Sequence, residues 1–226
     1  MRDPYSSIAN TRFPNRRARF PWSVWFCLCV ALLASPAPSS AQDEDCGELK
    51  NAYGPYDYRT VPPGSLNLVE AGHFTPDVER LIRGQSGYLG ADIDYTLRAI
   101  PNHPRAIVSM ANLSFKEKKD PPRGSRYTVN CWFDRAIRLA PDDPKVRSAF
   151  GYYLSRKGEL KKALEQLRLA LEMGQDDGNT HYNLGLVLFN LKEYDEALIQ
   201  AKEAESRGFP LQGLKNKLKA LNKWVD

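Results

Sequence analysis

The side chains best suited to chemistry in this sequence are three histidines and four cysteines. His73, His103 and His181 are scattered, and none has the spacing with which metal ligands converge on one ion. Beyond residue 41 the sequence contains no G-x-S-x-G, P-loop, H-E-x-x-H or C-x-x-C motif. We therefore predict no enzyme activity, no catalytic residue, no bound metal and no cofactor.

Residues 1–41 have the layout of a secretory signal peptide. Four arginines form a basic flank, the apolar run Trp22–Ala34 follows, and the small residues Ser39 and Ala41 stand at the −3 and −1 positions of a cleavage site. The run has 13 residues, fewer than the roughly 20 that a membrane-spanning helix needs. We therefore expect export with cleavage near Ala41, in preference to a retained anchor. An Arg16-Arg17 pair leaves the twin-arginine and general secretory routes both open.

Most of the net positive charge of the chain lies in this first segment. The whole sequence has 32 basic and 27 acidic residues, a net charge of +5. Residues 1–41 hold five arginines and one aspartate, so the remainder has 27 basic and 26 acidic residues. Nucleic-acid binding requires a basic patch on the folded domain. We therefore expect no nucleic-acid partner.

The cysteines divide in the same way. Cys27 and Cys29 lie in the apolar run, which leaves Cys46 and Cys131 in the exported part. An even pair in an exported protein indicates one disulfide. It would close a loop of more than 80 residues, which contributes about 4 kcal/mol in the chain-entropy model. Two buried free thiols are the alternative.

The region after the predicted signal peptide divides into an irregular segment and a pair of helices. Residues 42–74 are predicted to form an irregular strap, because tyrosines alternate with turn formers and Pro62-Pro63-Gly64 interrupts the chain. Thr75-Pro76 indicates the start of a short helix. A second helix is expected from about Tyr88 to Ala99, so 75–103 is predicted to be a degenerate helix pair.

The remaining sequence repeats. Two Pro-x-x-Pro turns, at 101–104 and 141–144, each separate a helix end from a new helix start. A period of 34 residues from the second turn defines units 144–177 and 178–211. The preceding unit, 104–143, has six extra residues between its helices.

Small residues recur at fixed positions of the last two units. These positions are occupied by Gly151, Ala163 and Ala170, and by Gly185, Ala197 and Ala204. In this pattern units 104–143, 144–177 and 178–211 resemble tetratricopeptide repeats (TPRs). The resemblance implies an all-α fold, a superhelix of about three helix–turn–helix units between the degenerate N-terminal pair and a C-terminal cap.

The end of the chain is predicted to cap the array. Leu214, Leu218, Leu221 and Trp224 follow helical spacing within 212–226. Solenoid units cannot bury their end faces alone, so a capping helix is expected here. The chain is also similar to exported proteobacterial TPR proteins, which implies a periplasmic location.

In TPR proteins the first helix of each unit lines a concave groove. Carried over to this sequence, the groove positions are Arg105, Asn112, Lys145, Tyr152, Arg156, Asn179, Tyr182, Asn183 and Phe189. Their amide, aromatic and basic groups suit an extended peptide. The resemblance thus implies a non-enzymatic adaptor for a protein or peptide partner. Self-association within a larger envelope complex is the alternative, and any one of these positions can equally be a plain solvated or packing residue.

One basic segment lies outside the repeat pattern. Residues 116–126, in the insertion of the first unit, contain three lysines, Lys116, Lys118 and Lys119, and two arginines, Arg123 and Arg126. Such runs are usually solvated and inert. Contact with an anionic membrane surface or an acidic partner is the less favoured interpretation.

Overall fold

The computed structural model describes residues 45–224, in which every regular element is a helix. The predicted signal peptide, 1–41, lies outside the described residues. The helices are α1 Pro63–His73, α2 Pro76–Glu79, α3 Leu89–Ala99, α4 Pro104–Glu117, α5 Val129–Leu139, α6 Pro144–Lys157, α7 Leu160–Glu172, α8 Gly178–Asn190, α9 Tyr194–Ser206 and α10 Gly213–Ala220. None of these helices is long and apolar enough to cross a membrane.

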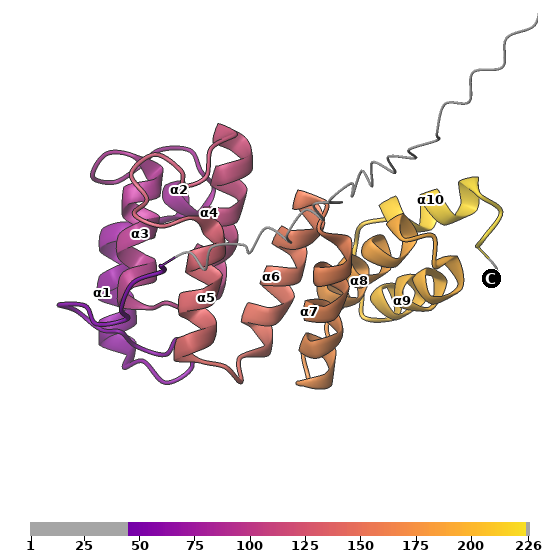
Figure 1. The fold of residues 1–226 in the computed structure, drawn as a ribbon, viewed down its shortest axis with the longest axis horizontal. Helices are drawn as coiled ribbons and strands as arrows, with labels where there is room; N and C mark the ends of the chain where they lie inside the picture. Colours follow the sequence, from indigo (N-terminus) through magenta and orange to yellow (C-terminus); the bar gives the residue numbers. More distant parts are fainter. Residues whose placement is uncertain (1–44, 225–226) are drawn as a thin grey trace, which may run out of the picture. The chain divides into compact units, whose positions relative to one another are not determined.

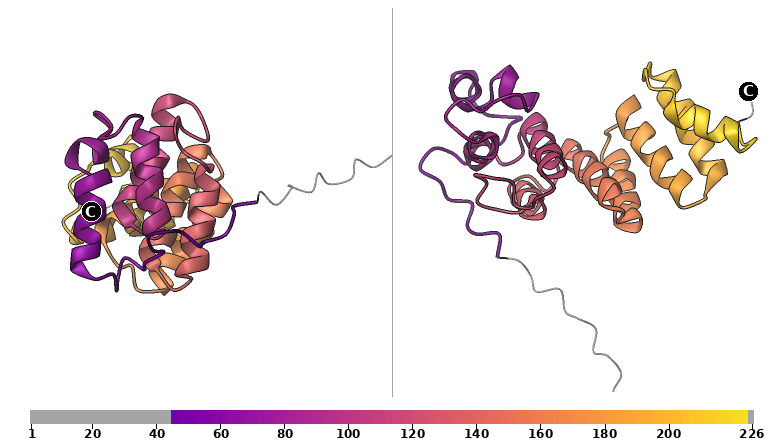
Figure 2. Two further views of the ribbon diagram at one scale, coloured as in Figure 1. Left: turned by 90° about the vertical axis from the view of Figure 1, so that its left-hand side faces the viewer. Right: turned by 90° about the horizontal axis from the view of Figure 1, so that it is seen from above.

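Consecutive helices pack in pairs, and the pairs stack on one another. Helix α6 packs along α7, α8 along α9, and α7 joins the two pairs through α8 (Figure 1). Figure 2 shows the same succession from two further directions. The fold is therefore the predicted all-α, TPR-type array, with α4 and α5, α6 and α7, and α8 and α9 as its three units.

An N-cap residue precedes each of the first helices α4 and α6. Pro104 and Pro144 occupy the first turns of α4 and α6, where the missing N–H leaves no hydrogen bond unmade. The residue before each of these prolines accepts a hydrogen bond from the helix backbone: His103 from Ala106, and Asp143 from Lys145. The Pro-x-x-Pro turns therefore start the helices at defined residues.

The repeated small residues allow the helices to approach closely. A Cβ atom added at Gly151 would lie 2.5 Å from Cγ of Leu167 on α7. One added at Gly185 would lie 2.4 Å from Cδ2 of Leu214 on α10. Ala163 on α7 has no exposed surface. The small residues of the repeat pattern thus set the distance between paired helices.

The prediction of an irregular segment over 42–74 is wrong for Pro63–His73, which forms helix α1. Pro63 occupies a first-turn position, where proline is compatible with a helix, so the proline pair starts the helix instead of preventing one. Helix α1 packs against α3, whereas α2 is a single turn between them. The two helices predicted within 75–103 are present as α2 and α3, but α3 packs more extensively on α1 than on α2.

The rest of the strap, residues 45–62, is irregular and is tied to the helices. Cys46 and Cys131 form the predicted disulfide, with their Cα atoms 4.9 Å apart. The Tyr56 N–H donates to the carbonyl of Ala99, and the Tyr58 N–H donates to the side chain of Asn102, at 2.9 and 2.8 Å. The strap therefore follows the turns that precede α4 and α6.

Asn102 joins three segments of the chain. Its buried side-chain amide donates to Asp57 of the strap and to Asp143 before α6, both at 2.8 Å. Hydrogen bonds from Arg59 hold the pKa of Asp57 down at about 2, so its carboxylate stays charged. This residue of the first Pro-x-x-Pro turn thus links the strap to the next repeat.

The C-terminal cap is shorter than predicted. Helix α10 buries Leu214 and Leu218 against the last unit, and Trp224 packs against the same core. Leu221 lies just past the end of the helix and is 46% exposed, so its predicted place in the buried stripe is wrong. The helix ends one residue before Leu221 because the chain turns into a left-handed residue at Asn222, with φ 54°.

Candidate peptide-binding groove

The first helices of the three units together line one cavity of about 580 Å³. Five of the nine predicted groove residues line it: Arg105 of α4, Lys145 and Tyr152 of α6, and Asn179 and Asn183 of α8. Three helices that are distant in sequence thus present polar, basic and aromatic groups to one space. This volume lies within the range typical of ligand pockets.

Two of the positive groups in the cavity have different electrostatic surroundings. Arg105 donates to Glu70 at 2.5 Å and to Glu79 at 2.8 Å, so its charge is balanced within the chain. Lys145 is exposed and forms no ion pair with any residue of 45–224. A ligand therefore meets a free ammonium at Lys145 but a neutralised guanidinium at Arg105.

The α8 wall of the cavity supplies amides. The side chain of Asn183 donates to Asn179 one turn earlier at 3.1 Å, which leaves further donors and acceptors of both amides open. Asp177, at the start of α8, also lines the cavity but is occupied in capping, since it accepts from the backbone N–H of Thr180. The amides are thus the hydrogen-bonding groups available to a peptide backbone.

Asn112, Tyr152 and Arg156 form one hydrogen-bonded cluster at the edge of the cavity. The Tyr152 hydroxyl donates to Oδ1 of Asn112 at 2.7 Å. Arg156 donates to the same oxygen and to the Tyr152 hydroxyl, both at 3.0 Å. Sequence spacing placed these three residues on the groove side, but it did not predict that they contact each other, since Asn112 and Arg156 are 44 residues apart.

Tyr182 and Phe189 do not line the cavity. Tyr182 packs on Phe209, with ring centroids 4.6 Å apart, and lies against α10. Phe189 packs edge-on to Tyr194, and Lys217 of α10 lies over its ring. The repeat pattern assigns both side chains to the groove side, but α10 covers that part of α8. Both residues therefore hold the cap in place.

The cavity also contains residues that the repeat pattern did not assign to it. Tyr58 of the strap lines one end, and Gln175 from the turn before α8 lines another part. The one sequence feature that could have indicated Tyr58 as a cavity residue is its aromatic ring in a segment of turn formers. The strap thus borders the cavity with this side chain, while its backbone follows the helix-connecting turns.

The histidines have structural contacts. His103 is fully buried, and this burial lowers its pKa against the opposing effect of a hydrogen bond with Glu70. His73 stacks on Tyr95 and contacts the buried carboxylate of Asp92. His181 lies between Gln200 and Asp176. Within residues 45–224, no three histidine, cysteine or acidic side chains come together as a metal site.

Comparisons with known proteins point to the same repeat class. No protein-family model matches the chain. Human tetratricopeptide repeat protein 7A is 29% identical over 130 residues, which are 57% of this chain and 12% of that protein. The human protein named protein O-mannosyl-transferase TMTC3 is 29% identical over 104 residues, 46% of this chain and 11% of that protein. The match thus spans only a small part of either relative.

One solved structure, titled MamA MSR-1 C2, covers 68% of this chain and 80% of its own, with 16% identity and a TM-score of 0.42. The stacked helix pairs with small residues at their crossings define a helical-repeat protein whose first helices line a groove. The match to tetratricopeptide repeat protein 7A agrees with a TPR-type helical-repeat array.

Proposed function

We propose that this protein is a non-enzymatic scaffold that binds an extended peptide segment of another protein in the groove formed by α4, α6 and α8. The observation that carries the proposal is the cavity of about 580 Å³ lined by Lys145, Tyr152 and Asn183. Open amides can pair with a peptide backbone, and Tyr152 offers a surface for a side chain. TPR proteins serve generally as protein-interaction scaffolds, which supports this assignment.

The proposal includes export to an oxidising compartment, the periplasm. The signal-peptide layout of residues 1–41 motivates it, and the disulfide between Cys46 and Cys131 supports it, because such bonds persist outside the reducing cytosol. Mass spectrometry of the protein from the exported compartment tests this part. We expect an N-terminus near Gln42, and an intact N-terminus at Met1 would contradict cleavage.

Self-association is the second candidate, and it has less support. Tyr182 and Phe189, two aromatic candidates for such a surface, already contact Phe209 and α10 of the same chain. A self-association surface would have to use other residues. Light scattering of the purified protein tests this candidate, which predicts a stable oligomer at micromolar concentration.

Pull-down from the exported compartment tests the groove. We expect Asn183→Ala and Tyr152→Ala each to reduce recovery of the partner, because each removes a group that lines the cavity. Asn216→Ala on α10 and Tyr88→Ala before α3 are the matched controls, since both residues are exposed and lie outside the cavity. Equal recovery with all four variants would show that the groove is not the binding site.

A further inference from the structure

Arg156 is held in place at the edge of the groove without an acidic partner. Its guanidinium lies 4.2 Å from the centre of the Phe115 ring, and it donates to Asn112 and Tyr152 at 3.0 Å. No carboxylate of residues 45–224 forms an ion pair with it. A stacked guanidinium with open donors is arranged in advance for a carboxylate.

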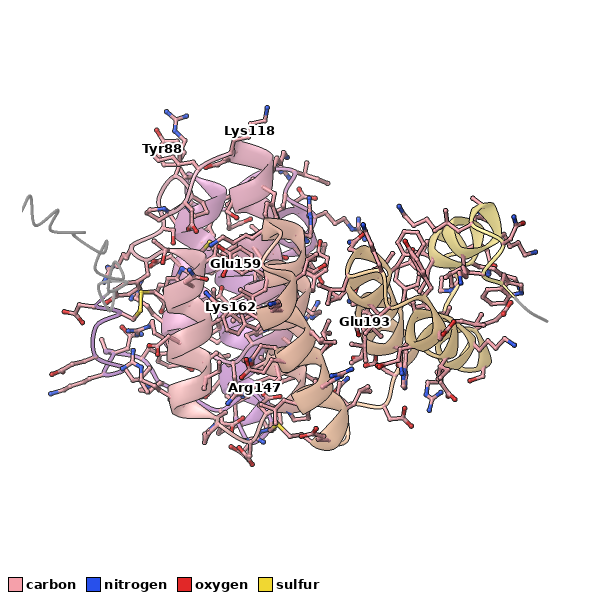
Figure 3. All side chains as sticks on the ribbon, turned by 45° about the vertical axis from the view of Figure 1, so that its right-hand side comes forward. Tyr88, Lys118, Arg147, Glu159, Lys162 and Glu193 are labelled. Atoms are coloured by element: carbon pink, nitrogen blue, oxygen red, sulfur yellow. A yellow bond between two sulfur atoms is a disulfide. The ribbon has the colours of Figure 1, made fainter. Side chains whose placement is uncertain are left out.

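A second hollow lies on the other side of Arg156. It has a volume of about 290 Å³, and Phe115 and Tyr153 form part of its wall together with Lys118, Lys119 and Lys157. Arg156 joins it to the groove, because the same guanidinium bonds Tyr152 of the groove and covers Phe115 of this hollow. Figure 3 shows Lys118 projecting from the end of its helix.

The charges in this hollow are unbalanced. Its acidic side chain, Asp120, is occupied on both oxygens: one accepts from the Val129 N–H at 2.8 Å and the other from the Tyr153 hydroxyl at 3.1 Å. Lys157 pairs with Glu159 at 2.9 Å. Lys118 and Lys119 form no ion pair within the described part of the chain. The hollow thus offers two free ammonium groups beside an aromatic wall.

We propose that Lys145, Arg156, Lys118 and Lys119 form one continuous track that selects acidic peptides, with aspartate or glutamate side chains of the ligand meeting Arg156 and the two lysines. The inference rests on the proposed peptide-binding function and specifies its ligand class. It also gives the insertion of the first unit a function, because Lys118 and Lys119 belong to that insertion.

The geometry favours a peptide over a membrane surface. Arg156 lies beside Tyr152, which lines a concave cavity shared by three helices. A flat bilayer surface cannot follow a path from that cavity past Phe115 into a second hollow, whereas an extended chain of about eight residues, roughly 27 Å long, can. Charge on a concave path also gives register to a peptide ligand.

Fluorescence anisotropy with two rhodamine-labelled peptides tests the track. The acidic probe is (Glu-Ser)4 and the neutral probe is (Gln-Ser)4, each titrated with the full chain at low and physiological salt. We expect the acidic probe to bind, the neutral probe to bind at least about tenfold more weakly, and salt to weaken the acidic probe. Equal binding of the two probes, or no binding of the acidic probe, would overturn the track.

Variants test whether the acidic probe binds at this surface. Lys118→Gln/Lys119→Gln and Arg156→Gln should each weaken the affinity for the acidic probe about fivefold or more. Arg156→Lys should give an intermediate affinity, because lysine keeps the positive charge but lacks the planar guanidinium that can donate two hydrogen bonds to one carboxylate. The control is Lys161→Gln/Lys162→Gln on α7. Neither residue lines the groove or the second hollow, so this variant should change binding less than about twofold. Circular dichroism confirms that each variant is folded, and equal affinities across all variants would overturn the inference.

Two further results separate the track from neighbouring hypotheses. Binding to phosphatidylglycerol vesicles that depends on Lys118 and Lys119, without binding to the acidic probe, would replace the peptide track with a membrane surface. Partner recovery that is lost with Asn183→Ala but unchanged with Lys118→Gln/Lys119→Gln would overturn the track and leave the groove in place. Recovery unchanged with Asn183→Ala would count against the groove itself.

Discussion

The guanidinium of Arg135 donates to the backbone carbonyl of Cys46 at 2.8 Å, directly beside the disulfide that joins Cys46 to Cys131. The same nitrogen donates to the carbonyl of Glu48 at 2.8 Å. A covalent bond and a buried cation on one helix, α5, therefore hold the same short piece of the strap. This double attachment fixes the start of the segment that later carries Tyr58 to the groove.

Reduction of the disulfide should destabilise the protein substantially. The bond closes a loop over a sequence separation of 85 residues, so the chain-entropy model gives a loss of about 4 kcal/mol. Urea unfolding with and without reductant measures it, with thiol alkylation and intact mass as proof of reduction. An unchanged transition in fully reduced protein would show that the noncovalent contacts of the strap hold it without the disulfide.

Arg135→Ala should lower the free energy of unfolding by about 2–4 kcal/mol, because it leaves two strap carbonyls without their donor. Burial lowers the pKa of this arginine, and its guanidinium lies 4.7 Å from the ring centre of Tyr127 and 5.6 Å from that of Trp132. Arg138→Ala is the control, since Arg138 is half-exposed and donates to Gly47 of the same strap. We expect a loss below about 1 kcal/mol there, and similar losses for both variants would refute the special role of Arg135.

Gly151→Ala tests the helix crossing that the repeat pattern predicts. The new Cβ would lie 2.5 Å from Leu167, so we expect a loss of about 1–3 kcal/mol in urea unfolding. Gly72→Ala in α1 is the matched control, because no atom lies within 4 Å of its added Cβ. Stability should stay equal there or rise by up to about 1 kcal/mol. If Gly151→Ala is as stable as Gly72→Ala, the crossing does not require a small residue.

His103 should make the protein less stable in mild acid. Its buried ring accepts the Ala106 N–H through Nδ1 and bonds Oε1 of Glu70 through Nε2, and Arg105 donates to the same Glu70 oxygen. Burial lowers the folded-state pKa, so the unfolded chain binds the proton first as pH falls below about 6.5. The stabilisation is therefore complete above that pH and declines below it.

His103→Asn separates this effect from other titrations. Asparagine keeps a helix-capping acceptor before α4 but cannot titrate. Between pH 7.5 and 5.5 we expect native stability to fall by up to about 1.4 kcal/mol more than that of the variant. Parallel pH profiles for the two proteins would mean that His103 is not the titrating group.

Much of the helical array could be predicted from the sequence, because close helix crossings restrict residue size at Gly151, Gly185 and Ala163. Helix α1 could not be predicted in this way. Pro63 and two glycines suppress its local helix signal, and the helix is stabilised instead by burying Val69 and by packing on α3. Local helix propensity therefore gives the wrong prediction for α1, because tertiary contacts stabilise this helix.

The site was predictable in part for a related reason. Helical position predicts the direction of a side chain, and Lys145, Tyr152 and Asn183, which it assigned to the groove side, line the cavity. It does not predict which other segment arrives at the same surface. Helix α10 covers Phe189, and the guanidinium of Arg156 stacks on a ring of the preceding unit, and neither contact has a sequence signal.

Hydrogen–deuterium exchange of the protein with and without its isolated partner tests the central claim most directly. The account predicts that the partner protects the first helices α4, α6 and α8, which carry Arg105, Tyr152 and Asn183, while the outer helices α7 and α9 exchange as before. Protection confined to α7 and α9, with none in α4, α6 and α8, would contradict a binding groove on this face.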